Sequence, residues 1–74
     1  MNSIFEAEVG RRIRALREAR KLTQEQMSAQ MQTRGCDVTR SALAKIEVGQ
    51  RHIYPDELKV IKEILRVDYS DILG

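Results

Sequence analysis

Apolar residues recur along the chain every three to four positions, a period that predicts helices with one buried face. In the first such stretch the apolar positions are Phe5, Val9, Ile13 and Leu16. Ser3 and Glu6 have the spacing of a capping box, so we expect a helix from near Ile4 to residues 20–21. Gly10 lies inside this helix at a cost of about 1 kcal/mol relative to alanine, which predicts that another helix packs closely there.

The stretch from Thr23 to Gly49 predicts two short helices joined by a turn. The first is expected over residues 23–32, because Thr23 and Gln26 form a second capping box. The second is expected over residues 39–48, between a threonine cap and the left-handed stop at Gly49. Their inward-facing residues are Met27, Met31, Leu43 and Ile46. This is the plan of a helix-turn-helix, whose second helix lies in the major groove of DNA.

The turn between these helices, residues 33–38, is longer than the three or four residues of a tight helix-turn-helix. Gly35 is expected to have a positive φ, and Val38 is expected to pin the turn to the core. Cys36 is expected to be exposed and without a regulatory role, because the neighbouring Asp37 opposes a reactive thiolate.

The last third of the chain predicts one full helix and one short one. Tyr54 and Pro55 begin the full helix, with proline at its first helical position. Its buried stripe is Leu58, Ile61, Ile64 and Leu65. A short final turn or helix is expected over residues 68–73. The elements together predict an all-α fold, a compact bundle of four to five short helices around a central helix-turn-helix.

A chain of 74 residues is expected to form a single domain, residues 1–74. The net charge of +2 is mild, but it is unevenly distributed. Residues 1–54 hold ten Lys or Arg against six Asp or Glu, and residues 55–74 hold three against five. A basic front and a mildly acidic rear suit a DNA-binding module. With two tyrosines, one phenylalanine and no tryptophan, a stacking platform for single strands is disfavoured.

Composition also argues against several other functions. A single cysteine rules out an internal disulfide, and Cys36 with His52 is too small a set for a metal site. No cofactor is expected, and no nucleophile–base or paired-carboxylate spacing suggests an enzyme. No apolar run approaches the ~18 residues of a membrane span, and the N-terminus lacks the order of a signal peptide. We therefore expect a cytoplasmic, nucleoid-associated protein.

Four stretches resemble the Xre/Cro-type helix-turn-helix family of phage and bacterial repressors: VGRRIRALREARKLTQEQMS, TRSALAKIEVGQR, LKVIKEIL and VDYSDIL. They extend from about Val9 to Leu73. The residues in family order are Arg17, Leu22, Thr23, Gln24, Ile46, Glu47 and Gly49. The resemblance implies a lambda-repressor-like bundle. The turn departs from the family, since it is longer than the usual one, which bears on how the second helix is angled.

The resemblance and the helical spacing together predict the DNA contacts. Arg40, Ser41 and Lys45 share an outward face of the second helix and are expected to contact base edges, with Arg40 bidentate to guanine. A solvated helix face is the alternative. The predicted phosphate contacts are Thr23, Gln24, Gln50, Arg51 and Arg34. An ordinary N-cap and a solvated loop are the alternatives for these positions. The resemblance also implies a structural ion pair between Arg17 and Glu47.

The leading functional hypothesis is a sequence-specific regulator of transcription that binds double-stranded DNA, most readily a repressor. A homodimer on a two-fold operator would separate two recognition helices by about 34 Å. The candidate dimer contact is Tyr69, Ile72 and Leu73, although Leu73 suits the core equally well. The alternative is a protein-interaction module, such as an antitoxin-like or adaptor subunit, that uses the same fold.

Overall fold

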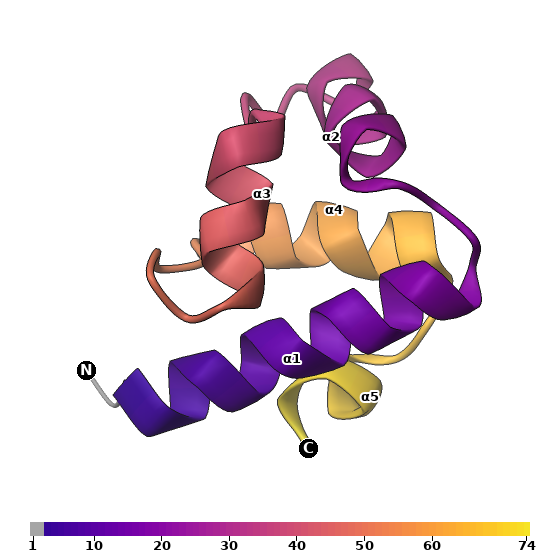
Figure 1. The fold of residues 1–74 in the computed structure, drawn as a ribbon. Helices are drawn as coiled ribbons and strands as arrows, with labels where there is room; N and C mark the ends of the chain where they lie inside the picture. Colours follow the sequence, from indigo (N-terminus) through magenta and orange to yellow (C-terminus); the bar gives the residue numbers. More distant parts are fainter. Residues whose placement is uncertain (1–2) are drawn as a thin grey trace.

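The computed structural model describes residues 3–74 and contains five helices. They are α1 (Ser3–Ala19), α2 (Gln24–Thr33), α3 (Arg40–Glu47), α4 (Pro55–Leu65) and α5 (Tyr69–Leu73). No strand occurs within residues 3–74, so the predicted all-α bundle is confirmed (Figure 1). The cap predicted at Ser3 lies outside the described side chains.

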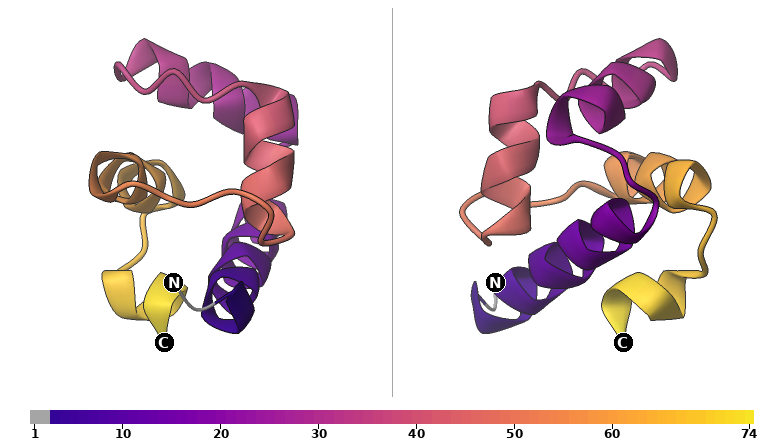
Figure 2. Two further views of the ribbon diagram at one scale, coloured as in Figure 1. Left: turned by 90° about the vertical axis from the view of Figure 1, so that its left-hand side faces the viewer. Right: turned by 45° about the vertical axis from the view of Figure 1, so that its right-hand side comes forward.

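The helices are arranged around α1 and α4. Helix α1 packs against α3, α4 and α5, while α2 packs against α3 and α4. Helices α2 and α5 lie at opposite ends of the molecule, with α4 between them (Figures 1 and 2). The consequence is that α2 and α3, the two helices of the motif, form one end of the molecule and leave α5 at the other.

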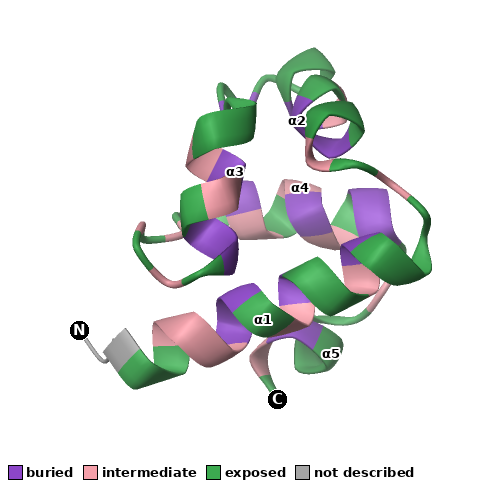
Figure 3. Cartoon of the chain, in the orientation of Figure 1, coloured by how far each residue is buried: buried purple, intermediate pink, exposed green. Residues whose placement is uncertain are grey.

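A single apolar core joins the five helices (Figure 3). Its buried hydrophobic residues are Val9, Ile13, Met27, Met31, Cys36, Val38, Leu43, Ile46, Ile61, Ile64, Leu65 and Ile72. The predicted stripes of the helices thus face inward, with one exception. The Phe5 side chain, predicted to be inward, is 44% exposed and lines an open apolar depression together with Leu58 of α4 and Leu73 of α5.

The long turn between α2 and α3 is packed rather than loose. Gly35 has φ +85°, and Val38 is fully buried. The hydroxyl of Ser28 donates to the carbonyl oxygen of Val38 at 2.8 Å, which ties the turn to α2. The prediction of an exposed Cys36 is wrong: its side chain is 7% exposed and its Sγ lies 3.9 Å from the carbonyl oxygen of Asp56 on α4. Burial raises the pKa of the Cys36 thiol, and nearby Asp56 adds to the effect.

The end of α3 lies directly against the backbone of α1. A Cβ on Gly10 would lie 2.2 Å from the carbonyl oxygen of Ile46, so the close packing predicted at this glycine is confirmed. Gly49, with φ +77°, provides the left-handed stop, and a Cβ there would lie 2.8 Å from the Cα of Ala7. The absence of a side chain at Gly10 and Gly49 therefore allows the end of α3 to lie directly against the backbone of α1.

The C-terminal segment differs from the predicted dimer contact. Ile72 is fully buried in the core beneath α1, so its side chain is unavailable to a second molecule. Tyr69 is 42% exposed, and the ammonium of Lys62 lies 5.1 Å from its ring centroid. Leu73 packs partly buried against the core. Of the helices in residues 3–74, none has the length and apolar content needed to cross a membrane.

Candidate nucleic-acid interface

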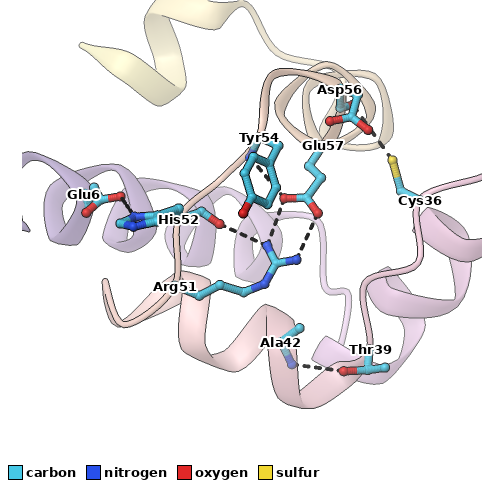
Figure 4. Close-up of polar contacts among 9 residues, drawn as sticks. All are labelled: Glu6, Cys36, Thr39, Ala42, Arg51, His52, Tyr54, Asp56 and Glu57. Carbon is cyan, nitrogen blue, oxygen red and sulfur yellow. Dashed lines mark hydrogen bonds and ion pairs between the residues drawn. The ribbon is translucent and has the colours of Figure 1, made fainter. Parts of the chain in front are cut away.

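The starts of α2 and α3 are capped by threonines in the same way. Thr23 accepts a hydrogen bond from the amide of Gln26 at 3.0 Å, and the Gln26 side chain accepts from the Thr23 amide at 2.9 Å. Thr39 accepts from the amide of Ala42 at 3.1 Å (Figure 4). These caps fix the first turn of each helix while its earliest amides stay directed outward, where the helix dipole favours anions.

Two open depressions lie where these helix starts meet. The larger, which we name the helix-start depression, has a volume of about 580 Å³ and is lined by Arg14, Arg17, Thr23, Gln24, Glu25 and Arg40. The smaller has a volume of about 260 Å³ and is lined by Gln24, Arg40, Ser41 and Ala44. Gln24 and Arg40 border both depressions, so the beginnings of α2 and α3 share one continuous polar surface.

The outward face of α3 contains the three residues for which base contacts are predicted. Arg40, Ser41 and Lys45 are all exposed, while Leu43 and Ile46 of the same helix are buried. Within residues 3–74, none of the three exposed side chains has a hydrogen-bond or ion-pair partner in the protein. Their donors are therefore available to a ligand that approaches this face.

A buried polar network sets the position of α3 relative to α1 and α2. Arg17 donates to Glu47 through Nε at 2.7 Å and through Nη2 at 3.1 Å. The side chains of Arg17 and Glu47 are 8% and 1% exposed. Arg17 also donates to the carbonyl oxygen of Leu22 at 2.7 Å, and Gln24 donates to Glu47 at 3.0 Å. The hydrogen bonds to Glu47 raise the pKa of Arg17, which therefore remains charged.

Gln24 consequently has two neighbours of different kinds. Its amide nitrogen is bonded to Glu47, and the residue also borders both depressions at the surface. The Gln24 side chain thus braces α3 and also lies at the beginning of α2, where a phosphate is predicted to bind.

The loop after α3 holds Arg51 within the protein (Figure 4). Its guanidinium donates to both carboxylate oxygens of Glu57, at 2.9 and 3.0 Å, and to the carbonyl oxygen of His52 at 3.0 Å. The guanidinium also lies 5.8 Å from the ring centroid of Tyr54. Hydrogen bonds from Arg51 lower the pKa of Glu57 despite its burial, and the Tyr54 amide contributes in the same direction. The structure thus gives Arg51 an internal carboxylate partner.

The neighbours of Arg51 differ from it. Gln50 is exposed, and the imidazole Nδ1 of His52 pairs with a carboxylate oxygen of Glu6 on α1 (Figure 4). The side chains of Gln50 and His52 are both exposed, and His52 in addition ties the loop to α1.

Arg34 is far from the helix starts. It follows the last residue of α2, and a ten-residue helix is about 15 Å long. Its guanidinium lies 3.9 Å from Glu63 of α4, and both side chains are nearly half exposed. The structure therefore does not bring Arg34 together with Gln24 and Arg40.

Arg14 borders the helix-start depression, although no role was predicted for it from the sequence. A signal for it exists in the sequence. Arg14 precedes Arg17 by three residues and so shares its side of α1, and Arg17 was already expected to reach the end of α3. Within residues 3–74, no group of three His, Cys, Asp or Glu side chains is suited to hold a metal ion.

Comparison with known proteins gives one match. Residues 10–73 match a family model described as a helix-turn-helix domain. Searches among curated proteins and among solved structures find no match to the chain. The matched range includes all of α2, α3, α4 and α5, together with more than half of α1.

Proposed function

The chain belongs to the helix-turn-helix domain family, and on that premise we propose that it is a sequence-specific regulator of transcription, a repressor, that binds double-stranded DNA through α3. Membership of the family itself supports DNA as the partner. We further propose that the chain belongs to the Xre/Cro branch, as the order of Arg17, Gln24 and Glu47 suggests.

One observation carries the proposal. The beginnings of α2 and α3 share one open polar surface, and the three outward side chains of α3 have no protein partner among the described residues. A helix that enters the major groove needs such a row of free donors, because each base pair presents its own pattern of donors and acceptors there. A merely solvated helix face would not need the neighbouring helix start to border the same depression.

The predicted DNA contacts fall into contacts with base edges and contacts with phosphates. Arg40 and Lys45 donate to guanine O6 and N7, and Ser41 bonds to a base edge or a phosphate. Thr23 and Gln24, at the positive end of the α2 dipole, bind a backbone phosphate. Gln50 adds a further phosphate contact beyond the end of α3.

Arg51 and Arg34 differ from these residues because both are already paired within the protein. Each already has a carboxylate partner, Glu57 for Arg51 and Glu63 for Arg34. A phosphate contact by Arg51 would leave the largely buried Glu57 carboxylate without its partner. We therefore propose that Arg51 braces the loop, and that Arg34 reaches DNA only where the duplex extends past the far end of α2.

Repression would follow from occupancy of the operator. A domain of this size makes few contacts, so we propose that two molecules bind a two-fold site with recognition helices about 34 Å apart. Tyr69 and Leu73 remain the candidate contact between the molecules, without the buried Ile72.

The test begins with selection of bound duplexes from a random pool, which reports the site, its symmetry and its half-site spacing together. Binding of the selected duplex and of an unrelated one is then measured by fluorescence anisotropy at two salt concentrations. Specific binding with a steep salt dependence is expected. Arg40→Ala and Lys45→Ala should each reduce discrimination at one base position by about 1–3 kcal/mol.

A matched control is Lys59→Ala, which removes an exposed cation from α4 rather than from α3. It should leave the choice of base unchanged. If no duplex is selected, or if Arg40→Ala and Lys45→Ala bind as the native protein does, the proposal fails. That outcome would favour the alternative, a protein-interaction module such as an antitoxin-like or adaptor subunit.

A further inference from the structure

The side of α1 that faces the motif presents a cation at the edge of the helix-start depression. We propose that Arg14 is a phosphate-binding residue, which extends the DNA interface from the two helices of the motif onto α1. The proposal rests on the proposed function, since it presupposes that DNA lies against the starts of α2 and α3. It adds a third helix to the surface that meets the duplex.

Arg14 is held at this position by the residue one turn further along α1. Arg17 is fixed by Glu47 and by the carbonyl oxygen of Leu22, so this side of α1 must face the beginning of α2. Residues three apart on a helix are surface neighbours. Arg14 therefore reaches the same depression as Thr23, Gln24 and Arg40, and its side chain is 57% exposed.

The charges around the depression leave Arg14 available. Arg17 is neutralised by Glu47, while Glu25 contributes one carboxylate to the lining. Arg14 and Arg40 are then the two cations that line it without a buried partner. Glu18 lies 3.5 Å from Arg14, but it is one turn away on the same helix and is 56% exposed. Such an exposed pair is weak, and a phosphate can replace its carboxylate.

A phosphate is the expected ligand, rather than a base. The major groove is about 12 Å wide and admits one helix, which in this fold is α3. A cation on a flanking helix therefore meets the sugar–phosphate backbone beside the groove, where contacts fix position and carry no sequence information. A planar guanidinium is also well suited to bidentate binding of a phosphate.

The experiment compares two arginines of α1 in the full chain. Arg14→Ala and Arg12→Ala remove the same charge from the same helix. However, Arg12 lies toward α5, with its guanidinium 3.5 Å from the carbonyl oxygen of Ile72 and 3.8 Å from Glu8. Affinity for the selected duplex and for an unrelated duplex is measured by anisotropy over a series of salt concentrations. Thermal unfolding of each variant confirms that it folds.

Arg14→Ala should weaken binding to both duplexes by the same factor and should lower the slope of log K against log salt by about 0.9, the value for one phosphate contact. Arg12→Ala should leave this slope at the native value, and Arg14→Lys should restore most of it. A slope that Arg14→Ala changes no more than Arg12→Ala does would overturn the proposal. Native protein that fails to bind any duplex would instead overturn the proposed function, so the two failures are distinguishable.

Discussion

Gly10→Ala gives the sharpest test of how α1 holds α3, because two effects with opposite signs compete there. Helix propensity alone predicts that the substitution stabilises the protein by about 0.5–1 kcal/mol, since glycine inside a helix is unfavourable. The structure predicts the opposite. The added Cβ would lie 2.2 Å from the carbonyl oxygen of Ile46 and 2.9 Å from the carbonyl carbon of Glu47.

The size of the effect follows from these distances. Carbon and carbonyl oxygen come into contact at about 3.3 Å, so α1 and the end of α3 must separate by about 1 Å. The atom in the way is backbone, and the Ile46 oxygen also accepts the Gly49 amide at 3.1 Å, so it cannot rotate aside as a side chain would. Overpacking of this kind costs about 1–3 kcal/mol. After the gain of about 0.5–1 kcal/mol from helix propensity is subtracted, the net loss is about 1 kcal/mol, which would lower Tm by about 4–8 °C in a domain of this size.

The assay is reversible urea unfolding followed by circular dichroism, supported by thermal unfolding. Ala15→Gly is the matched control, because Ala15 is exposed on the same helix and tests propensity without packing. It should destabilise by about 1 kcal/mol. Propensity alone predicts opposite signs for the two substitutions, whereas the structure predicts that both destabilise.

A Gly10→Ala protein as stable as the native one, or more stable, would refute the reasoning. It would mean that α1 and α3 do not approach as closely as 2.2 Å implies, or that they separate at no cost. Under the proposed function the same variant should also bind DNA more weakly, because displacement of the last turn of α3 changes its angle in the groove.

Three further predictions concern the polar network, the thiol and a titrating carboxylate. Glu47→Ala should lower the free energy of unfolding by about 3–5 kcal/mol, because it leaves the buried Arg17 guanidinium without its partner. Replacement of both residues, by Arg17→Met with Glu47→Leu, should lower the free energy of unfolding less than Glu47→Ala does. Urea unfolding of the native protein, the single variant and the double variant measures this, and a double variant as unstable as Glu47→Ala would contradict the prediction. Cys36 should react with an aromatic disulfide reagent far more slowly in the native protein than in urea, since burial raises its pKa; equal rates would contradict its placement. The pKa of Glu57 is below its usual 4.5, so the stability that this group contributes is fully present above about pH 4.5 and is lost as pH falls through the lowered value. Glu57→Gln should therefore be less stable than the native protein at about pH 7 and should lose less stability on acidification, measured by urea unfolding down to about pH 2.

The helices could be predicted from the sequence because their signals are local. Helix α2 was expected over residues 23–32 and is observed as Gln24–Thr33, behind the predicted cap at Thr23. Helix α3 was expected over residues 39–48 and is observed as Arg40–Glu47, between Thr39 and Val48 as its flanking residues. Caps, glycine stops and apolar spacing each depend on a few neighbouring residues, so one sequence is enough to recognise them.

What the sequence did not reveal depends on residues far apart in the chain. Cys36 is buried because α4 lies against the long turn, and nothing within the turn indicates that. The phosphate contact of Arg51 stays a prediction, but the sequence did not reveal that Glu57 accepts hydrogen bonds from both of its terminal nitrogens across the Tyr54–Pro55 corner. Arg14 borders the helix-start depression because the beginning of α2 lies beside α1. In each case the surroundings of the side chain are set by residues that are distant in sequence and close in space.

Helix α3 is short, and it therefore depends on contacts with the other helices. Helix α3 has eight residues and is about 12 Å long. Isolated helices need ~12–15 residues to be even marginally stable in water. Its existence and its direction must therefore come from packing, and the contacts that supply them all lie on its inner side. The end of α3 lies against Gly10, and Glu47 joins it to Arg17 and Gln24. The side chains on the outer side of α3 therefore do not hold the helix in place. Such a scaffold allows the outward residues to change without loss of the fold and, under the proposed function, would allow the preferred DNA sequence to change with them.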